Sequence, residues 1–408
     1  MRIAVFSDNF YPELSGISDS IITTARELAQ RGHTIRFFAP KYAPRDYRKV
    51  GLPLEEQNLH ERISITRFSS LPYGGPSGQA RIVVPTGLRT YLVRQFKPDI
   101  IHAHMIFGVG FEGLIASRVL QCPFIGTNHT PLTEFMKYSP VRSKWFISLL
   151  LSYNSWYYNR CAFVSSPASE IFEEMRRYGF RAPHAVVSNP IDCSLFHPMD
   201  GDRATLKREF GLSPFTILYA GRLAPEKRID NLLDAFAACA KALPGATVAI
   251  VGKGPSEAML RAHAGKLGIG DRVRFLGFLK NAEVLARAYR ASEVFAIMSP
   301  AETQSIVAMQ ALACGIPAIG SRAWGIGEYL GKAGQLTVEP GDTEKLAEHL
   351  VALFRSPHLR AELGAKGRAF AETISTSAVA AEWERIYEET VSRYHIKSGK
   401  NLHPPHTL

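Results

Sequence analysis

The sequence predicts an α/β fold of two Rossmann-like domains, each built on a parallel sheet, that face each other across a cleft. Two observations lead to this prediction. Short apolar runs alternate with helical patterns along the whole chain, which is typical of parallel sheets covered by helices. A stretch with two prolines and a glycine, residues 190–202, interrupts the series near its middle and indicates an interdomain linker. A length of 408 residues suits two such domains.

The first half of the chain shows a regular series of strands, and helices such as 18–31 and 109–120 fit between them. The expected strands are residues 2–7, 33–39, 63–68, 99–104, 123–128, 161–165 and 184–188. A second series follows the linker, at residues 215–220, 246–251, 272–276, 293–298, 316–320 and 335–338. Three helical stretches then close the chain, at residues 342–355, 357–371 and 376–395.

Composition narrows the class of protein. The net charge of +11 is spread over both halves, which argues against a nucleic-acid-binding tail. The five cysteines lie far apart with no C-x-x-C pair, so we expect reduced thiols in the cytoplasm rather than a disulfide scaffold or metal cluster. The first strand is too short to be a signal peptide, and no apolar run reaches the length of a membrane span. We therefore expect a cytoplasmic protein that is soluble or peripheral on the inner face of a membrane.

The most informative stretch runs over residues 299–320. A buried apolar strand ends in Ser-Pro, and Glu302 follows it just ahead of a helix. Backbone N–H groups at a helix start are unpaired donors at the positive end of the helix dipole, so this junction suits a phosphate or diphosphate. A carboxylate beside it can accept hydrogen bonds from sugar hydroxyls. Phosphate and polyol together indicate a nucleotide-sugar.

Two other turns follow strands of the second series. Arg222 and Lys227 lie in the turn after the first strand, where such cations can clamp a diphosphate. Ordinary solvated loop cations explain them equally well. Gly252 and Gly254 end the next strand, where they either let a nucleotide approach the backbone or form a simple turn.

The first half contributes a glycine and three histidines. Gly16 joins the first strand to its helix, and either lets a phosphate or sugar approach the helix start or merely forms a turn. His129 follows a later strand at the same edge, so we expect it to point into the cleft toward a donor hydroxyl or the acceptor. His102 and His104 share one face of an earlier strand. We interpret them as structural, because no third residue has metal-ligand spacing.

Two stretches have competing explanations. Asp200 and Asp202 have the D-x-D form of some divalent-metal sites, but they precede a helix at residues 203–210, where Asp is a good N-cap. We interpret them as caps. The aromatic stretch 145–158 is either one face of a core helix or an interfacial helix, because arginine and lysine flank its tryptophans and tyrosines.

Taken together, these motifs resemble the retaining GT4 glycosyltransferases, which have the GT-B fold. In the second half, the resemblance rests on Gly221-Arg222…Lys227, Val251-Gly-Lys-Gly-Pro255, Phe275-Leu-Gly277 and Glu302…Ala311-Leu-Ala-Cys-Gly-Ile-Pro317. In the first half, it rests on the opening strand with Gly16, Lys97-Pro-Asp-Ile-Ile-His-Ala-His104, His129 and Val187-Ser-Asn-Pro-Ile-Asp192. It covers nearly the whole chain.

The resemblance implies a metal-independent hexosyltransferase that uses a nucleotide-sugar, with UDP-sugars favoured over GDP-sugars. Residues 1–190 would form the acceptor domain, to which a final helix at about 376–395 returns, and residues 203–375 would form the donor domain. Because no strong side-chain nucleophile is evident in the sequence, our hypothesis is front-face retention, with the departing phosphate as the base.

The resemblance also assigns roles to residues, with Glu302 holding the transferred hexose and His129 beside the reacting sugar. Arg222 and Lys227 would bind the donor diphosphate and stabilise the charge of the leaving group. Gly16 and Gly252 would approach the donor closely. The donor would further contact residues Gln304, Ser305, Ile306, Val307 and Gln310.

Three positions depart from the family pattern. Gln310 stands where the second glutamate of the E-x7-E motif binds ribose, so charge-assisted strength is lost there. Ser305 replaces a usual glycine. Asn189-Pro190-Ile191-Asp192 replaces N-G-x-D. These departures affect the expected nucleotide preference and leave the fold unchanged.

The acceptor we expect is a membrane glycerolipid such as diacylglycerol, because the first domain is basic and aromatic and residues 128–134 look like those of lipid glycosyltransferases. A soluble or polysaccharide-precursor acceptor stays open. So do a nucleotide-sugar epimerase and a non-catalytic nucleotide-sugar-binding subunit, the latter prompted by Gln310.

Overall fold

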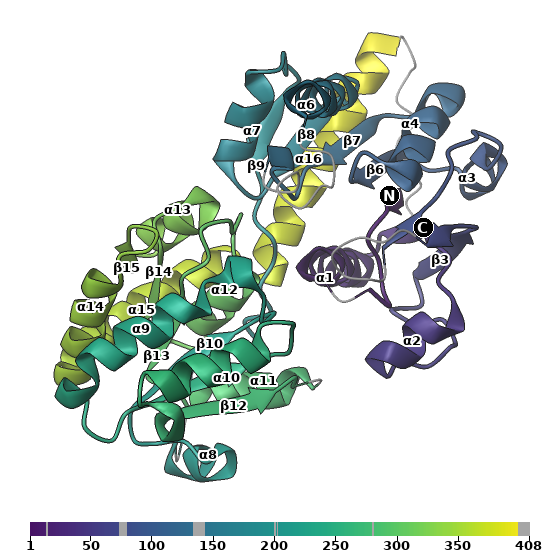
Figure 1. The fold of residues 1–408 in the computed structure, drawn as a ribbon. Coiled ribbons are helices and arrows are strands. Elements are labelled where there is room, and N and C mark those ends of the chain that lie inside the picture. Colours follow the sequence, from purple (N-terminus) through teal and green to yellow (C-terminus); the bar gives the residue numbers. More distant parts are fainter. Residues whose placement is uncertain are drawn as a thin grey trace. The chain divides into compact units, whose positions relative to one another are not determined.

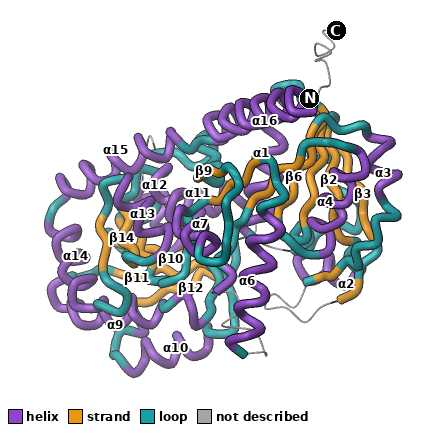
Figure 2. Tube along the Cα trace, turned by 90° about the horizontal axis from the view of Figure 1, so that it is seen from above, coloured by secondary structure: helices purple, strands orange, loops and turns teal. Residues whose placement is uncertain are grey.

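The structure is a computed structural model that describes residues 1–13, 15–72, 80–133, 143–199, 201, 203–279 and 281–398 (Figure 1). The chain divides into two compact units. One comprises residues 1–190 together with the segment that starts at Thr376, and the other comprises Ile191–Ser375. Within each unit the strands form a central sheet with helices on its faces (Figure 2).

The sheet of the first unit has the strand order β3-β2-β1-β6-β7-β8-β9, and all of its neighbouring strands pair in parallel. Its strands are β1 (Arg2–Ser7), β2 (Thr34–Pro40), β3 (Ile63–Phe68), β6 (Ile100–His104), β7 (Phe124–Thr127), β8 (Phe163–Ser166) and β9 (His184–Val186). These bounds lie close to those expected from the apolar runs.

Among the described residues, the helices of the first unit include α1 (Gly16–Gln30), α2 (Pro44–Val50), α3 (Thr90–Phe96), α4 (Gly108–Leu120), α6 (Lys144–Tyr158), α7 (Ser169–Arg176) and α16 (Thr376–Ser398). A short antiparallel hairpin, β4 (Leu71–Pro72) and β5 (Arg81–Ile82), is added outside the main sheet. The alternation of strands and helices did not predict this hairpin, because each of its strands is only two residues long.

The last helix, α16, belongs to the first unit although it follows the second unit in sequence. It packs along α1, and Glu384 of α16 pairs with Arg31 (2.9 Å) and with His33 (2.9 Å) just beyond the end of α1. Trp383 and Tyr387 of α16 are buried. Apolar burial, the ion pair with Arg31 and the contact with His33 thus all attach this helix to the first unit.

The sheet of the second unit has the strand order β12-β11-β10-β13-β14-β15 and is also parallel throughout. Its strands are β10 (Thr216–Ala220), β11 (Thr247–Val251), β12 (Val273–Gly277), β13 (Val294–Ile297), β14 (Ala318–Ser321) and β15 (Leu336–Val338). Together the two sheets confirm the predicted fold class of two Rossmann-like, parallel-sheet domains.

Side chains cap the starts of some helices in the second unit. Asn281 accepts hydrogen bonds from the backbone at the start of α11 (Ala282–Arg290), and Asp342 does so for α14 (Thr343–Arg355). The remaining helices are α8 (Arg203–Phe210), α9 (Ile229–Cys239), α10 (Glu257–Lys266), α12 (Ile306–Ala313), α13 (Trp324–Lys332) and α15 (Pro357–Thr373). Single turns of 3-10 helix occur at Pro225–Lys227, Ala240–Ala242 and Gly270–Arg272.

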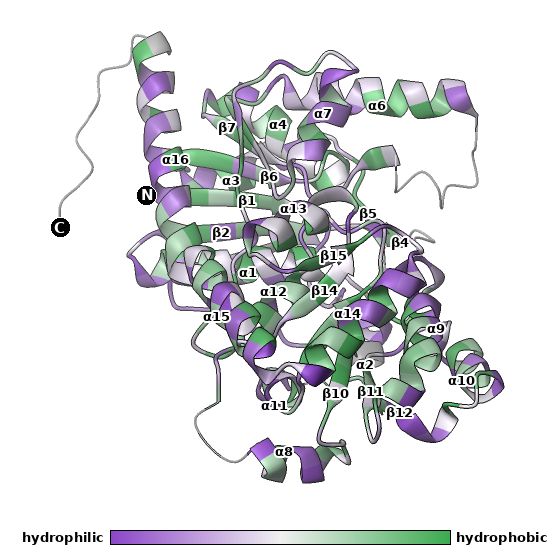
Figure 3. Cartoon of the chain, turned by 90° about the vertical axis from the view of Figure 1, so that its left-hand side faces the viewer, coloured by the Kyte–Doolittle hydropathy of each residue, from purple (hydrophilic) through white to green (hydrophobic). Residues whose placement is uncertain are grey.

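Hydrophobicity follows this architecture. The central strands β10 and β14 are green in Figure 3, whereas α8 is largely purple. Every residue of β10 and β13 is buried, as expected for strands covered on both faces. Among the residues that the structure describes, none of the helices combines the length and the apolar character that crossing a membrane requires.

Candidate functional site

The second unit has its topological switch point between β10 and β13. From β10 the sheet extends through β11 to β12 on one side, and from β13 through β14 to β15 on the other. The loops that leave the carboxyl ends of β10 and β13 therefore diverge to opposite faces, which is where ligands bind in open parallel sheets. Arg222 and Lys227 lie in the first of these loops and Glu302 lies in the second.

The structure brings Lys227 and Glu302 together across this switch point. The Lys227 ammonium donates to a Glu302 carboxylate oxygen, and the two side chains are 21% and 16% exposed. Arg222 pairs instead with Glu226 and is 51% exposed. The site thus holds one partly buried ion pair and one accessible guanidinium next to it in the same loop.

The start of α12 follows Glu302 and offers backbone N–H groups at the switch point. The Gln304 side chain is fully buried and Ser305 nearly so, whereas Ile306 and Val307 are half-buried. Ser305 precedes the helix with φ of +62°, a left-handed conformation that favours glycine. This backbone shape explains physically why a glycine is usual at the position of Ser305 in the pattern that the sequence resembles.

The glycines after β11 are needed for packing between loops. A Cβ on Gly252 would lie 1.8 Å from the Gly221 carbonyl oxygen, and one on Gly254 would lie 2.2 Å from the Leu223 carbonyl oxygen. The loop after β11 therefore lies directly against the loop after β10 that carries Arg222. The two glycines shape the site whether or not they also approach a ligand.

Gln310, the amide at the position of an expected carboxylate, lies on α12 and contacts the next helix. Its Oε1 is 3.2 Å from the hydroxyl of Tyr289 on α11. The same hydroxyl is 2.9 Å from the Val307 carbonyl oxygen. Tyr289 is fully buried, while Gln310 is half-buried.

The first unit has a corresponding switch point between β1 and β6. Gly16 is the first residue of α1, and Ser15 before it caps the helix by accepting from the Ser18 N–H at 3.2 Å. The hydroxyls of Ser15 and Ser18 both donate to Asn9 Oδ1, at 2.5 and 2.7 Å. Side chains of the chain itself thus fix the loop around Gly16.

Asp8 occupies the start of α4 at this switch point. Its carboxylate oxygens accept from the N–H groups of Val109 (2.7 Å) and Gly110 (3.1 Å). Burial raises the pKa of Asp8 to about 6, against the opposing effect of these N–H donors. The helix start that is suited to an anion is therefore taken by a carboxyl group of the protein.

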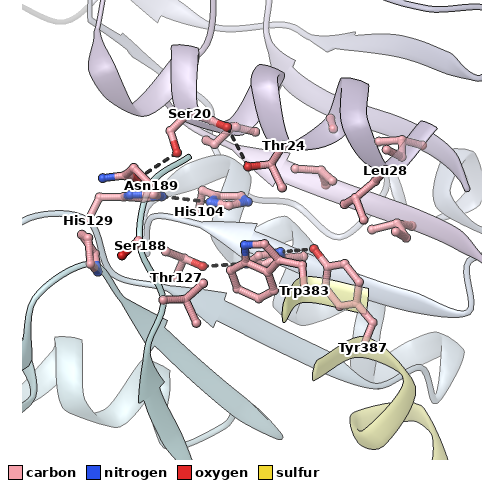
Figure 4. A pocket seen from close by; sticks show the side chains of 18 residues that line it. Ser20, Thr24, Leu28, His104, Thr127, His129, Ser188, Asn189, Trp383 and Tyr387 are labelled. Atoms are coloured by element: carbon pink, nitrogen blue, oxygen red, sulfur yellow. Dashed lines mark hydrogen bonds between the residues drawn. The ribbon is translucent and has the colours of Figure 1, made fainter. Parts of the chain in front are cut away.

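His129 and His104 form a buried pair beside an internal cavity of about 30 Å³, room for a single water molecule (Figure 4). His104 Nδ1 lies 2.9 Å from His129 Nε2, so one ring donates and the other accepts. The ring of His102 packs against that of His104 in a tilted arrangement, with ring centroids 4.1 Å apart. Side chains of α1 and of α16, among them Trp383, complete the wall of the cavity (Figure 4).

Burial controls the protonation of all three histidines. It lowers the pKa of His129 to about 4 and that of His102 to about 3, and it lowers the pKa of His104 well below its usual range. Each ring is therefore neutral at pH 7. His129 can donate or accept a hydrogen bond there, but it carries no positive charge to offer a phosphate.

Both ring nitrogens of His102 have hydrogen-bond partners within the first unit. Its Nδ1 lies 2.8 Å from the Tyr387 hydroxyl of α16, and its Nε2 lies 2.7 Å from the Thr127 hydroxyl. Over the ranges that the structure covers, no three His, Cys, Asp or Glu side chains are grouped as a metal site would require. Asp200 and Asp202 lie outside the described residues.

The aromatic helix α6 has one buried face and one exposed face that carries apolar side chains. Tyr157 and Tyr158 are buried in the core, whereas Trp145 is 72% exposed and Leu149 and Trp156 are also exposed. Arg160 lies over the ring of Trp156 at 3.6 Å from its centroid. One face of the helix supports the first unit, and the other presents tryptophan and leucine to its surroundings.

The sequence did not lead us to predict the contacts of Asp8 at the start of α4 or of Tyr289 with Gln310. Asp8 follows β1 in a Ser-Asp-Asn segment, and a carboxylate at a strand end was a usable signal. Tyr289 had no signal, because a tyrosine near the end of an amphipathic helix is an ordinary core residue.

Two parallel-sheet units, each with polar residues at its switch point, define a class of nucleotide-binding α/β proteins. Comparison with known proteins narrows the class. Residues 202–370 match the family described as Glycosyl transferases group 1, and residues 14–195 match Glycosyltransferase Family 4. The chain belongs to the GT4 family of glycosyltransferases, which transfer a sugar from a nucleotide-sugar donor and have the GT-B fold.

Similar proteins span the full length of the chain. An alpha-monoglucosyldiacylglycerol synthase of Acholeplasma laidlawii is 24% identical over 98% of this chain and 100% of its own length. A GDP-mannose-dependent alpha-mannosyltransferase of Mycobacterium tuberculosis is also 24% identical, over 98% of each chain. Among solved structures, Anabaena HepE in complex with UDP has a TM-score of 0.75 and 20% identity, covering 95% of this chain and 100% of its own.

Proposed function

We propose that this protein transfers a hexose, with retention of configuration, from a UDP-sugar to a membrane glycerolipid such as diacylglycerol. The observation that carries the proposal is the ion pair of Lys227 and Glu302 at the start of α12. The donor contains a diphosphate and a polyol, and this site offers a cation for the first and a carboxylate for the second.

Each half of the ion pair matches one half of the donor. We assign Glu302 to the hydroxyls of the transferred hexose, which donate to its carboxylate, and Lys227 and Arg222 to the diphosphate. The N–H groups at the start of α12 supply further donors, with Ser305, Ile306 and Val307 nearest to the helix start. Together these groups stabilise the charge that develops on the departing diphosphate.

The remaining assigned residues orient the donor. We assign Gln310 to the ribose, the Gly252 loop to the nucleotide, Gln304 through its backbone to the sugar, and Gly16 to the phosphate or sugar. His129 is assigned to a hydroxyl of the reacting sugar, as a neutral hydrogen-bonding group. With these groups in place, we propose a front-face reaction in which the departing phosphate accepts the proton of the acceptor.

A lipid acceptor is supported by the exposed face of α6. Trp145, Leu149 and Trp156 are an aromatic-aliphatic set that suits the interface of a bilayer, and Arg160 beside them suits anionic headgroups. A net charge of +11 favours the same surface. The names of the Acholeplasma laidlawii relative and of its Streptococcus pneumoniae counterpart (26% identical) both specify a monoglucosyldiacylglycerol product. We therefore propose a peripheral location on the cytoplasmic face of a membrane.

The test is transfer by purified protein. UDP-glucose, UDP-galactose and GDP-mannose would each be offered with liposomes of diacylglycerol and phosphatidylglycerol, and lipid-linked hexose would be measured. We expect product with a UDP-sugar, and a loss of about a hundredfold or more in Glu302→Gln and Lys227→Ala, the scale for removing a group that stabilises the transition state. Glu348→Gln, which changes an exposed, ion-paired carboxylate on α14, is the matched control.

Three outcomes would contradict the proposal. Conversion of the UDP-sugar without any acceptor would indicate an epimerase, and nucleotide binding without turnover would indicate a non-catalytic subunit. Transfer to a soluble acceptor alone would overturn the lipid assignment. For the membrane contact, sedimentation with anionic liposomes should fall in Trp145→Ala and Leu149→Ser but not in Met259→Ser, an exposed apolar residue of the second unit.

A further inference from the structure

The Tyr289 hydroxyl lies between two oxygen atoms in the second unit. It is 2.9 Å from the carbonyl oxygen of Val307 and 3.2 Å from Oε1 of Gln310. The tyrosine is fully buried, and its ring packs edge-on against Phe196 with centroids 5.9 Å apart. Burial holds the pKa of Tyr289 well above its usual range, so the hydroxyl keeps its hydrogen. Tyr289 is thus a rigid group with one hydrogen to donate.

One hydrogen cannot satisfy both oxygens. The Val307 carbonyl is the nearer acceptor, so donation to it leaves the hydroxyl oxygen free to accept in turn. The two ends of a glutamine amide have the same shape and exchange by a half-turn of the side chain. All three groups are satisfied when the NH₂ of Gln310 faces Tyr289 and donates to it. The Gln310 carbonyl oxygen then faces away from Tyr289.

We propose that Tyr289 is a positioning residue that holds the Gln310 amide with its carbonyl oxygen toward the ribose of the bound nucleotide. The inference rests on the proposed function, in which Gln310 contacts the ribose. In this orientation the amide accepts from a ribose hydroxyl as a carboxylate would. Gln310 thereby provides a hydrogen-bond acceptor for the ribose, as the usual glutamate does, although it lacks the negative charge of a glutamate.

The proposal distinguishes an amide from a carboxylate at this position. A carboxylate presents an acceptor at either end, so it has no orientation to be fixed. Loss of the Tyr289 hydroxyl therefore weakens nucleotide binding when residue 310 is Gln, and it has no such effect when residue 310 is Glu. A role of Tyr289 in packing alone would weaken binding equally in both backgrounds.

The experiment measures the Kd of UDP, and of GDP in parallel, by calorimetry in four proteins: the wild type, Tyr289→Phe, Gln310→Glu and the double variant. We expect Tyr289→Phe to raise the Kd about threefold to tenfold, the ratio that one neutral hydrogen bond gives. Gln310→Glu and the double variant should bind equally well, and this equality also shows that Tyr289→Phe leaves the fold intact.

A ribose readout completes the test. With 2′-deoxy and 3′-deoxy nucleotides, the wild type should lose affinity by a larger factor than Tyr289→Phe does, because only the wild type holds the carbonyl toward the missing hydroxyl. Two results would overturn this inference alone. One is that Tyr289→Phe weakens nucleotide binding by the same factor with Gln310 and with Glu at that position. The other is that Tyr289→Phe does not weaken binding when residue 310 is Gln. Failure of the wild type to bind either nucleotide would overturn it together with the proposed function.

Discussion

Ser305 shows how a single residue can fit a site at a cost to stability. It adopts φ of +62° without making a side-chain capping bond, and its buried hydroxyl has no partner among the described residues. A left-handed conformation costs a non-glycine residue about 1 kcal/mol, and an unpaired buried hydroxyl adds to that cost.

We expect Ser305→Gly to stabilise the protein by about 1 kcal/mol, because glycine adopts this backbone conformation without a Cβ clash. In thermal unfolding, this corresponds to an increase in Tm of about 2–4 °C for a unit of this size. Ser305→Ala is the control, since it removes the hydroxyl but keeps the Cβ. If the Tm of Ser305→Gly is no higher than that of Ser305→Ala, backbone strain at this position does not destabilise the protein.

At the scale of elements, the loops after β10 and β11 behave as one structure. Gly254 lies so close to the Leu223 backbone that no side chain fits, whereas Gly265 in α10 has nothing within 4 Å of an added Cβ. The same substitution should therefore have opposite effects at the two positions.

We expect Gly254→Ala to destabilise the protein, with two backbone segments forced apart, and to weaken nucleotide binding through the displaced Arg222 loop. Gly265→Ala should stabilise it by about 0.5–1 kcal/mol, because alanine is the better helix former. Urea unfolding and UDP titration of both variants check the pair. Equal effects of the two substitutions on stability would contradict the loop-packing argument.

The order of elements was largely predictable because buried parallel strands produce continuous apolar runs. The strands that pair in the two sheets lie close to the expected positions, whereas the β4–β5 hairpin was missed because its pairing is too short to produce a pattern.

The roles of individual residues were harder to predict than the secondary structure. Glu302 and Lys227 could be nominated because each follows a strand of the same sheet, and side chains at one carboxyl edge meet.

Contacts between distant segments could not be predicted in this way. Asp8 reaches Val109, 101 residues away, and Tyr289 reaches Gln310 from another helix. The apolar periodicity of α11 predicts which of its residues face the core. It does not predict which neighbouring group a buried hydroxyl such as that of Tyr289 contacts. Such contacts depend on how helices pack, and a single sequence contains no periodic signal for that.

At the scale of the whole molecule, the first unit is completed only by the last helix of the chain. Trp383 is 5% exposed and packs on His102, with ring centroids 4.6 Å apart, and Tyr387 bonds to the same histidine. The buried histidines that adjoin His129 are thus covered by residues encoded about 280 positions later. The first unit cannot complete its core before the second unit has been synthesised.

We expect Trp383→Ala to destabilise the first unit by about 3–5 kcal/mol, the cost of removing a large side chain from a packed core. The second unit has its own sheet and core, so the loss should be confined to the first. Hydrogen exchange measured by mass spectrometry checks this: amides of β1 and β6 should lose protection while those of β10 and β13 keep it. Ile396→Ala, at a 73% exposed position of the same helix, should change neither set. Equal loss of protection in both sheets would show that α16 stabilises the molecule as one cooperative body, rather than the first unit alone.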